Sequence, residues 1–547
     1  MSIARTPAEV DYLDGGAFVA ARAARARPAR ALWAVALAGA FGAAMFLAVT
    51  GPDAVINVGG WSQLGRFFAA AVSPELSGAF LGLVWDATLT TLAYATLGTA
   101  MSLAIGAVGG VLSSGAWRGT RRGTGWTIAR AALSLPRGAH EVVWGLILVN
   151  ILGADPWVAV LAIGVPYGAV TARVFAELLD EVPRAPHTAL RAAGATRLTA
   201  LMYAVIPPAR RDLLSYSFYR FECSIRSAAI LGIIGAGGLG YELALSFRTL
   251  RYDEMWTLIY ALMALSGAAD LWSGSLRRTG AGPRARGGVA GRALGASAVA
   301  AVVLVVASAV LLCPAPAALW SERTRALAGE LAADAWPPRF GGTAETGLLE
   351  ASFDTIVMSL IAIGLATSAA VAVAFVAGSP GRRTDGVHRG VRAAGKIVLL
   401  LCRAVPPPVW ALLVLFVLFP GPLPGAVALA IYNFGILGRL MTEVVDNLDD
   451  GPADLLTASG APPMSRFLYG TLPAVAGRFA ALGAYRWEMA MRETVVVGAV
   501  GAGGLGRVLT EQLRAFDFAA VTGTVLVLVA LTFMVDVVGA RVRGAFR

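Results

Sequence analysis

The sequence has few charged residues and few residues that bind metals. Only 14% of its 547 residues are Asp, Glu, Lys or Arg, whereas a soluble domain usually has about a quarter. Its three cysteines, Cys223, Cys313 and Cys402, lie far apart in or beside apolar stretches and match no metal-ligand spacing, and its three histidines are also scattered. No G-x-x-x-x-G-K-[ST] motif occurs, so the chain cannot cradle ATP phosphates in that manner. A soluble enzyme, a metal site and an ATPase of that type are not expected.

Long apolar runs, by contrast, recur along the whole chain. Hydrophobic residues make up 57% of the sequence, and the mean hydropathy is +0.69. Runs long enough to cross a roughly 30 Å hydrocarbon core occur at 32–50, 86–108, 158–176, 293–313, 354–378 and 518–538, among others. The sequence therefore predicts an all-α polytopic membrane protein.

Positive charge is confined to short segments between the apolar runs. The net charge of +11 therefore orients membrane helices, and no nucleic-acid partner is expected. Placing the basic segments inside predicts cytoplasmic N- and C-termini in a bacterial inner membrane, with six spans on each side of a basic linker. The predicted parts are a cytoplasmic segment 1–31, a repeat 32–276, the linker 277–292 and a second repeat 293–547. The spans near 126–152 and 395–420 begin with Arg and Pro residues and are expected to be tilted or broken.

The two halves repeat each other at an offset of 266 residues, without a gap from Arg137/Arg403 to Gly240/Gly506. Charged and aromatic matches, which similar composition does not explain, include Trp144/Trp410, Arg173/Arg439, Glu177/Glu443, Tyr219/Tyr485, Arg220/Arg486, Glu222/Glu488 and Arg226/Arg492. Upstream, Asp86 matches Asp354 at an offset of 268. An even number of spans in each half predicts two parallel repeats with a central pathway at their interface. Trp144 and Trp410 are expected to be interfacial anchors.

A glycine-rich motif closes an apolar segment in each half. It consists of Gly235, Gly237, Gly238 and Gly240 in the first half and of Gly501, Gly503, Gly504 and Gly506 in the second. The spacing fits the dinucleotide fingerprint, but no soluble βαβ context surrounds it and position 260 is Tyr rather than an acid. We expect a turn at which a helix ends and backbone approaches backbone.

A second pair of motifs lies in predicted cytoplasmic segments. Thr188 and Ala189 begin a stretch that leads to Gly194 and Pro207, and Asp454 and Leu455 begin its counterpart, which leads to Gly460 and Pro473. The spacing resembles the coupling loop of ABC importer permeases, in which an acid, small residues and a Gly lead to a late Leu-Pro. Half one departs from that pattern because Thr188 stands where the acid is expected. A generic helix-turn-helix connection is the alternative for one copy, and the second copy at the same register favours the coupling loop.

The segment before each glycine motif is more specific. Tyr219-Arg-Phe-Glu222 with Arg226, and Tyr485-Arg-Trp-Glu488 with Arg492, resemble the permease subunits of phosphonate importers. That resemblance implies a type I ABC importer permease fold, here with both permeases fused in one chain. It also implies two ATP-binding subunits, which would hold ATP and Mg, and an extracytoplasmic solute-binding protein, so no cofactor or catalytic residue is expected in this chain.

Two acid and arginine pairs have a spacing of one helical turn. Glu222 with Arg226, and Glu488 with Arg492, can each form an ion pair along a helix. Because a charge at the bilayer centre costs roughly 2.5 to 3.5 kcal/mol on insertion scales, these faces should turn toward the bundle interior or the pathway. Two interpretations stay open: a structural pair that locks the helix, or arginines that contact an anionic substrate.

The sequence predicts that the protein is the permease of an ATP-driven importer for phosphonates or related phosphorus oxyanions. It would work by alternating access. A methionine or betaine importer is the alternative within the class, because the glycine motif is shared with those permeases. From another class, an ion-coupled secondary transporter also uses parallel repeats and intramembrane charges. A membrane-embedded enzyme is disfavoured, since no carboxylate pair or His/Cys cluster converges in both halves.

Overall fold

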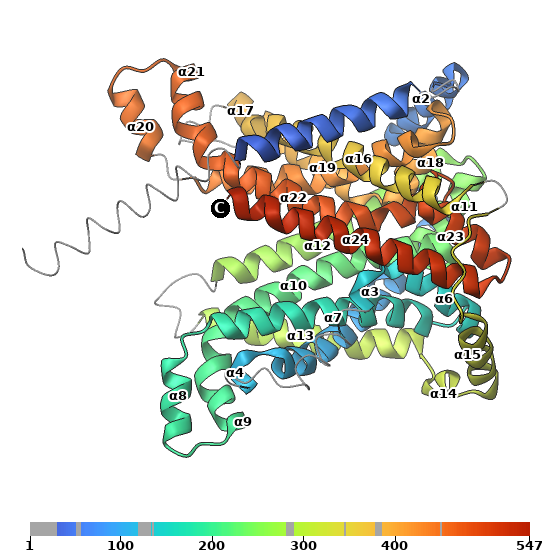
Figure 1. Ribbon diagram of the computed structural model, residues 1–547, viewed down its shortest axis with the longest axis horizontal. Coiled ribbons are helices and arrows are strands. Elements are labelled where there is room, and N and C mark those ends of the chain that lie inside the picture. The colour runs from blue at the N-terminus through green and yellow to red at the C-terminus, as the bar shows by residue number, and fades with distance from the viewer. Residues whose placement is uncertain are drawn as a thin grey trace, which may run out of the picture.

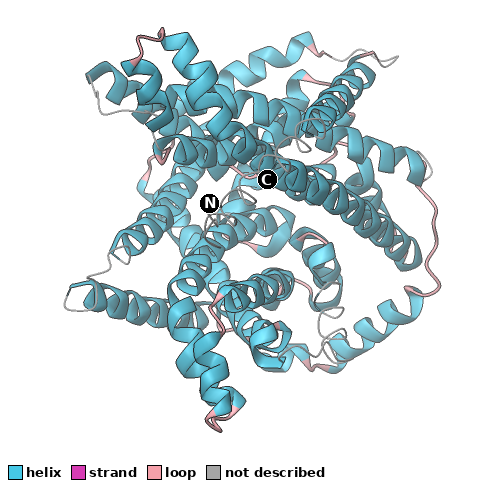
Figure 2. Ribbon diagram, turned by 60° about the vertical axis from the view of Figure 1, so that its left-hand side comes forward, coloured by secondary structure: helices cyan, strands magenta, loops and turns pink. Residues whose placement is uncertain are grey.

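The computed structural model describes residues 30–50, 56–118, 133, 136–279, 289–343, 346–377, 386–448 and 451–546. Within these ranges every regular element is a helix (Figure 2), and the only strand-like pairing is an isolated bridge between Ile56 and Leu418. The all-α prediction is therefore confirmed. The predicted segment 1–31 lies almost wholly outside the described residues.

Eight described helices are long and apolar enough to cross a membrane. They are Arg30–Val49, Gly78–Ser113 (α3), Trp157–Glu181 (α7), Tyr252–Ser275 (within α12, Tyr252–Thr279), Gly295–Leu312 (within α13, Val289–Leu312), Leu348–Val376 (within α16, Leu348–Ala377), Pro422–Asp446 (α19) and Phe518–Phe546 (α24). Counting two bent helix pairs as one span each gives up to ten. Twelve spans were expected, so two of them do not meet these criteria of length and composition in the described residues.

The two remaining spans have different explanations. In the first half, the segment near 126–152 is described mainly from Pro136 onward, where α6 (Glu141–Leu152) is only 12 residues long. In the second half, α22 (Leu472–Gly498) has 27 residues, but several arginines and glutamates reduce its hydropathy. The predicted break near 395–420 is confirmed, because α17 (Gly386–Ala404) and α18 (Pro407–Val417) meet at an angle of 95°. Pro406 lies at that bend and cannot continue a helix.

The two repeats run in the same direction. In each half two long helices pack closely, α3 on α7 in the first and α16 on α19 in the second. The short helices α8 (Ala185–Ala192) and α9 (Arg197–Ala200) project from one end of the molecule, together with α20 (Gly451–Ala458) and α21 (Pro463–Ser465). Helices α11 (Leu239–Arg248) and α23 (Gly504–Arg514) both lie toward the other end (Figure 1). Equivalent segments therefore share an end, as parallel repeats require.

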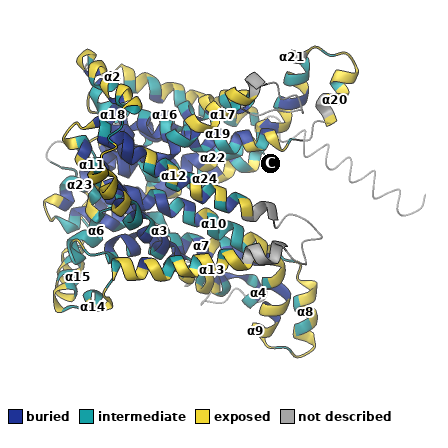
Figure 3. Ribbon diagram, turned by 180° about the vertical axis from the view of Figure 1, so that it is seen from behind, coloured by how far each residue is buried: buried dark blue, intermediate teal, exposed yellow. Residues whose placement is uncertain are grey.

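The first helix of each half packs against the opposite half. The ring of Phe41 lies against Gly364 of α16, and Arg30 Nε donates a hydrogen bond of 2.9 Å to the carbonyl of Ala545. In the same way α13, which begins the second half, packs along α3 of the first. Most of α13 is exposed in Figure 3, whereas α7 is largely buried and α3 is partly buried. These two outer helices tie the halves together and present their apolar faces to lipid.

The structure corrects one detail of the repeat. The Oγ1 atom of Thr91 accepts a hydrogen bond from Leu239 N, and that of Thr355 accepts the matching bond from Leu505 N. The upstream offset is therefore 264 rather than 268, so Asp86 does not correspond to Asp354. The boundaries of the linker 277–292 stay a prediction, because α12 ends at Thr279 and α13 begins at Val289, and the residues between lie outside the described ranges.

Candidate translocation pathway

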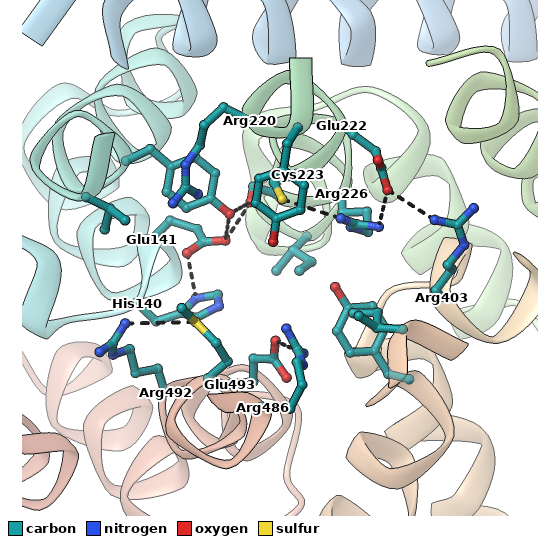
Figure 4. Close-up of a pocket in the computed structure, with 18 of the residues that line it drawn as sticks. His140, Glu141, Arg220, Glu222, Cys223, Arg226, Arg403, Arg486, Arg492 and Glu493 are labelled. Atoms are coloured by element: carbon teal, nitrogen blue, oxygen red, sulfur yellow. Dashed lines mark hydrogen bonds and ion pairs between the residues drawn. The ribbon is translucent and has the colours of Figure 1, made fainter. Parts of the chain in front are cut away.

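A cavity of about 420 Å³ lies between the two halves, beside the central helices α10 (Ile206–Leu231) and α22. Its polar wall comes from both repeats (Figure 4). It includes Arg137, Glu141, Tyr167, Arg220, Glu222 and Arg226 from the first half and Arg403, Tyr432, Arg439, Arg486, Arg492 and Glu493 from the second. The predicted central pathway at the repeat interface therefore has a physical counterpart in this cavity.

Positive charge is in excess around this cavity. Seven arginines line it, against four glutamates. Asp270 and Glu488 pair with three of these arginines from outside the wall, which leaves an excess of one positive charge. Charges this deep in a membrane protein usually mark a substrate or ion pathway. The cavity is therefore suited to a small anion.

The two predicted ion pairs along the helices are formed. Arg226 lies 3.1 Å from Glu222, and Arg492 lies 3.0 Å from Glu488, and all four side chains are largely buried. Both arginines are thus engaged by a carboxylate on their own helix. Their contact with substrate stays a prediction.

Glu222 also belongs to a network that joins the two halves. Arg403 lies 3.1 Å from Glu222 and is paired with Asp270 as well. Arg439 lies 2.7 Å from Asp270 and 3.4 Å from Glu222. Both carboxylates come from the first half and both arginines from the second, so this cluster closes one side of the interface between the repeats.

The equivalent cluster on the other side is not formed. Its members would be Arg137 and Arg173 from the first half and Glu488 and Asp536 from the second. Among the described residues, Arg173 pairs only with Glu177, at 3.0 Å, and Arg137 makes no ion pair. A cavity of about 290 Å³ opens instead between Arg137, Arg173 and Asp536. The two repeats are therefore alike in sequence but asymmetric at their contact.

Arg220 and Arg486 occupy equivalent positions but have different surroundings. Arg486 Nε donates to Asn433 Oδ1 at 2.8 Å, and its terminal nitrogen lies 2.8 Å from Glu493 Oε1. Arg220 Nε donates to the Tyr216 hydroxyl at 3.0 Å, and its guanidinium carbon lies 4.4 Å from the ring centre of Tyr167. Both arginines are 7% exposed, yet only Arg486 has a carboxylate partner.

The two loops predicted to couple to an ATPase have matching shapes. In each, a glycine ends the first short helix with a positive φ, +87° at Gly194 and +79° at Gly460, a conformation that favours glycine. Pro207 and Pro473 follow within the first turns of α10 and α22. The acid that distinguishes the loops, Asp454, lies in the first turn of α20 and 3.7 Å from Arg466. Thr188 instead donates to the carbonyl of Ala185, at 2.9 Å, within its own helix.

Apolar side chains are exposed at equivalent positions of these loops. Leu198 corresponds to Met464 and Tyr203 to Tyr469, and each is more than half exposed. Leu455 is 74% exposed, and its equivalent, Ala189, offers a smaller surface. The role of these loops in binding an ATPase stays a prediction.

The glycine motifs form the expected turns. Gly235, Gly237 and Gly238 have positive φ angles, as do Gly501, Gly503 and Gly504. A Cβ atom at Gly240 would collide with the carbonyl of Ala229, and one at Gly506 with the carbonyl of Val495. The close approach of backbone to backbone is therefore confirmed. The two turns border a cavity of about 900 Å³ at the end opposite to the coupling loops.

Trp410 differs from the sequence prediction. It is 6% exposed, and its Nε1 donates to the carbonyl of Cys402 at 3.2 Å, while Trp144 donates to the carbonyl of Pro136 at the same distance. Both bonds span eight residues, across the bend before α18 and its counterpart before α6. The tryptophans fix these bends, and the expectation of a lone interfacial anchor is wrong for Trp410, because its ring is buried in the core.

Sequence reasoning missed Asp270, and it named Arg403 and Arg439 only as matches within the repeat. One available signal was that all three are charged residues in or beside apolar segments, and all three recur at the 266-residue offset, as Asp536, Arg137 and Arg173. The differences around Arg220 were also visible, because Tyr167 and Ser227 stand opposite Asn433 and Glu493.

Parallel helical repeats, a charged central cavity and a protruding loop on each repeat define a polytopic membrane permease. Two segments, 127–313 and 370–546, match the family described as binding-protein-dependent transport system inner membrane component. These segments make up more than half of the chain, which therefore belongs to that family. Membership confirms that the chain is a multi-pass inner membrane component of a transport system rather than an enzyme, and it does not favour a secondary transporter.

Two characterised relatives are similar to large parts of the chain. The phosphate-import permease protein PhnE of Mycolicibacterium smegmatis is 25% identical over 418 residues, or 76% of this chain and 77% of the relative. The phosphite transport system permease protein PtxC of Stutzerimonas stutzeri is 32% identical over 217 residues, or 40% of this chain and 77% of the relative. Among solved structures, the MetNI methionine ABC transporter aligns with a TM-score of 0.32 and 19% identity, covering 37% of this chain and 98% of the other. A similarity that low supports no statement on substrate.

Proposed function

We propose that this chain, which contains two permease repeats, is the permease of an ATP-driven importer that carries a small phosphorus oxyanion, such as a phosphonate, phosphite or phosphate, into the cytoplasm. The observation that carries the proposal is the arginine-rich cavity between the repeats. Phosphorus oxyanions carry between one and two negative charges near neutral pH, and arginine binds them through paired N–H donors. The names of the two relatives, a phosphate importer and a phosphite transporter, point the same way.

We propose a different partner at each end of the molecule. Two ATP-binding subunits, which supply ATP and Mg, would dock on the loops α8/α9 and α20/α21, one on each repeat. An extracytoplasmic binding protein would deliver the substrate above the cavity that the glycine turns border. In this proposal both coupling loops and both termini would lie in the cytoplasm.

The proposed cycle is alternating access. Closure of the ATP-binding subunits would move the two loops, and with them α10 and α22, which begin directly after each loop. The cluster of Glu222, Asp270, Arg403 and Arg439 joins the halves in the present state. Rearrangement at such a contact is a common way to switch between two discrete states.

The alternative substrates fit the cavity less well. Methionine is a zwitterion and betaine carries a quaternary ammonium group, so each would bring a positive charge beside seven arginines. Neither of the two relatives described above is named as a methionine or betaine permease.

The direct test is stimulation of ATP hydrolysis by substrate-loaded binding protein. The fused chain, its ATP-binding subunits and its binding protein would be assembled in lipid nanodiscs and offered phosphite, methylphosphonate, phosphate or methionine. Stimulation by at least one phosphorus oxyanion and none by methionine supports the proposal. Stimulation by methionine alone contradicts the proposed substrate.

A further inference from the structure

Four arginines of the central helices α10 and α22 line the cavity. Among the described residues, Arg220 is the one of these four that has no carboxylate partner. Arg220 is 7% exposed and lines the cavity. Within the described part of the chain, the only hydrogen bond of its side chain runs from Nε to the Tyr216 hydroxyl. Its two terminal nitrogens, which carry four N–H donors, therefore have no acceptor.

The nearby acid does not neutralise Arg220 through a direct bond. Glu141 Oε1 accepts from the Ser227 hydroxyl at 2.5 Å and from the Tyr167 hydroxyl at 3.1 Å instead. The face of the Tyr167 ring lies 4.4 Å from the Arg220 guanidinium carbon, and such a contact stabilises the cation without using its N–H groups. In Figure 4 no dashed line joins Arg220 to a carboxylate.

The equivalent arginine is fully engaged. Where the first half has Tyr167 and Ser227, the second half has Asn433 and Glu493, and these two side chains bind Arg486 at 2.8 Å each. The residue differences at both positions have the same effect on the arginine. Asn433 and Glu493 each accept a hydrogen bond from Arg486, whereas neither Tyr167 nor Ser227 accepts one from Arg220. Fusion of two permeases in one chain permits this divergence, which two identical subunits could not show.

We propose that the oxyanion binds on the first half of the cavity, with Arg220 as its bidentate ligand, while Glu493 keeps Arg486 from binding it. This inference rests on the proposed function and assigns its substrate site. A single arginine of the central helices without a carboxylate partner suits a transporter, because binding must be strong enough to draw the anion in and weak enough to release it. A second free arginine on the facing helix would hold the anion more tightly and slow its release.

The matched variants are Arg220→Gln and the double change Arg486→Gln with Glu493→Gln. Arg220→Gln removes a buried cation that has no carboxylate partner but also loses the contacts of that cation with Tyr167 and Tyr216, so the Tm of the ligand-free complex is measured beside its affinity. The double change removes both members of an ion pair and leaves no orphaned charge. Binding of inorganic phosphite, phosphate and methylphosphonate to the chain with its ATP-binding subunits, without binding protein, would be measured by calorimetry and by the shift in Tm.

We expect Arg220→Gln to weaken oxyanion binding at least tenfold and to abolish the ligand-induced rise in Tm. Arg220→Lys should weaken it less, because the charge stays but the paired donors are lost. The double change should alter the affinity by no more than about twofold. Equal losses in both variants, or unchanged binding in Arg220→Gln, would overturn the proposal. A lower Tm of ligand-free Arg220→Gln with unchanged affinity would show a structural role only, which also overturns it.

An opposite variant tests the same claim if Arg220→Gln does not assemble. Glu493→Ser gives the second half the residue that the first half has at this position, and it frees Arg486. We expect tighter oxyanion binding and slower net uptake, and an unchanged affinity would overturn the proposal. If wild type binds none of the three oxyanions, the proposed function itself fails. If wild type binds an oxyanion and the changes in the two halves lower its affinity equally, only the assignment to Arg220 fails.

Discussion

Arg403 and Glu222 lie 181 positions apart in the chain, yet their side chains are 3.1 Å apart across the interface of the two repeats. Their equivalents, Arg137 and Glu488, form no such pair within the described residues. A molecule built from two nearly equal halves therefore closes its interface on one side and leaves it open on the other. This asymmetry yields the first prediction.

Asp270→Asn should destabilise the protein more than Asp536→Asn. Asp270 is paired with two arginines of the other half, whereas Asp536 has Arg543 at 3.9 Å as its one described ion-pair partner. Removing one member of a largely buried pair costs about 3–5 kcal/mol, against about 0–1 kcal/mol for a weak, partly exposed pair. The measurement is the Tm of the purified complex. Equal shifts for the two variants would contradict the asymmetric interface.

Asp454→Ala should weaken binding of the ATP-binding subunits more than Thr188→Ala. Asp454 is exposed and carries a charge that a partner can use, while the Thr188 hydroxyl donates to carbonyls of its own helix. Because exposed ion pairs contribute less than about 1 kcal/mol, we expect a two- to fivefold change in affinity. Surface plasmon resonance with the isolated ATP-binding subunit would measure it. A larger loss in Thr188→Ala would exclude the proposed role of the acid.

Gly240→Ala should impair folding, whereas Gly267→Ala should not. An added Cβ at position 240 would meet the carbonyl of Ala229, a backbone group that cannot move aside, and at position 267 the nearest atom is 4.0 Å away. Alanine also favours the helix by about 1 kcal/mol over glycine at an interior position such as 267. The fraction of monodisperse protein after extraction reports the effect. Normal yield and Tm of Gly240→Ala would show that the turn tolerates a side chain.

Arg492→Gln should harm the protein more than the same change combined with Glu488→Gln. Both side chains are largely buried and pair at 3.0 Å, and Glu488 also has Arg543 at 3.6 Å. Loss of Arg492 alone leaves the buried Glu488 with only the more distant Arg543, whereas loss of both residues removes the buried pair as a whole. Uptake and Tm would be measured in parallel. If the double variant recovers Tm but not uptake, Arg492 contacts substrate in addition to its structural pair.

Much of this architecture could be predicted from the sequence because it depends on local patterns. Apolar length predicted the membrane helices, and the 266-residue offset predicted parallel halves. Glycines at fixed spacing predicted the turns at Gly235 and Gly501. In each case the signal lies within one segment or in its repetition.

The pairing across the repeats could not be predicted in the same way. Arg403 and Asp270 are distant in sequence, and their contact depends on how two helices cross rather than on any spacing. For a related reason, length and composition recognise at most ten of the twelve expected spans among the described residues. In α22 the charged residues turn toward the central cavity, so its composition does not resemble that of a lipid-facing span.

The central claim is that this chain imports a phosphorus oxyanion when ATP-binding subunits drive it. The most direct measurement is uptake into lipid vesicles that hold the chain with its ATP-binding subunits, with binding protein outside, ATP inside, and labelled phosphite, methylphosphonate, phosphate and methionine offered in parallel. The account predicts ATP-dependent, vanadate-sensitive accumulation of at least one phosphorus oxyanion and none of methionine. Accumulation of methionine alone, or uptake driven by an ion gradient without ATP, would contradict it.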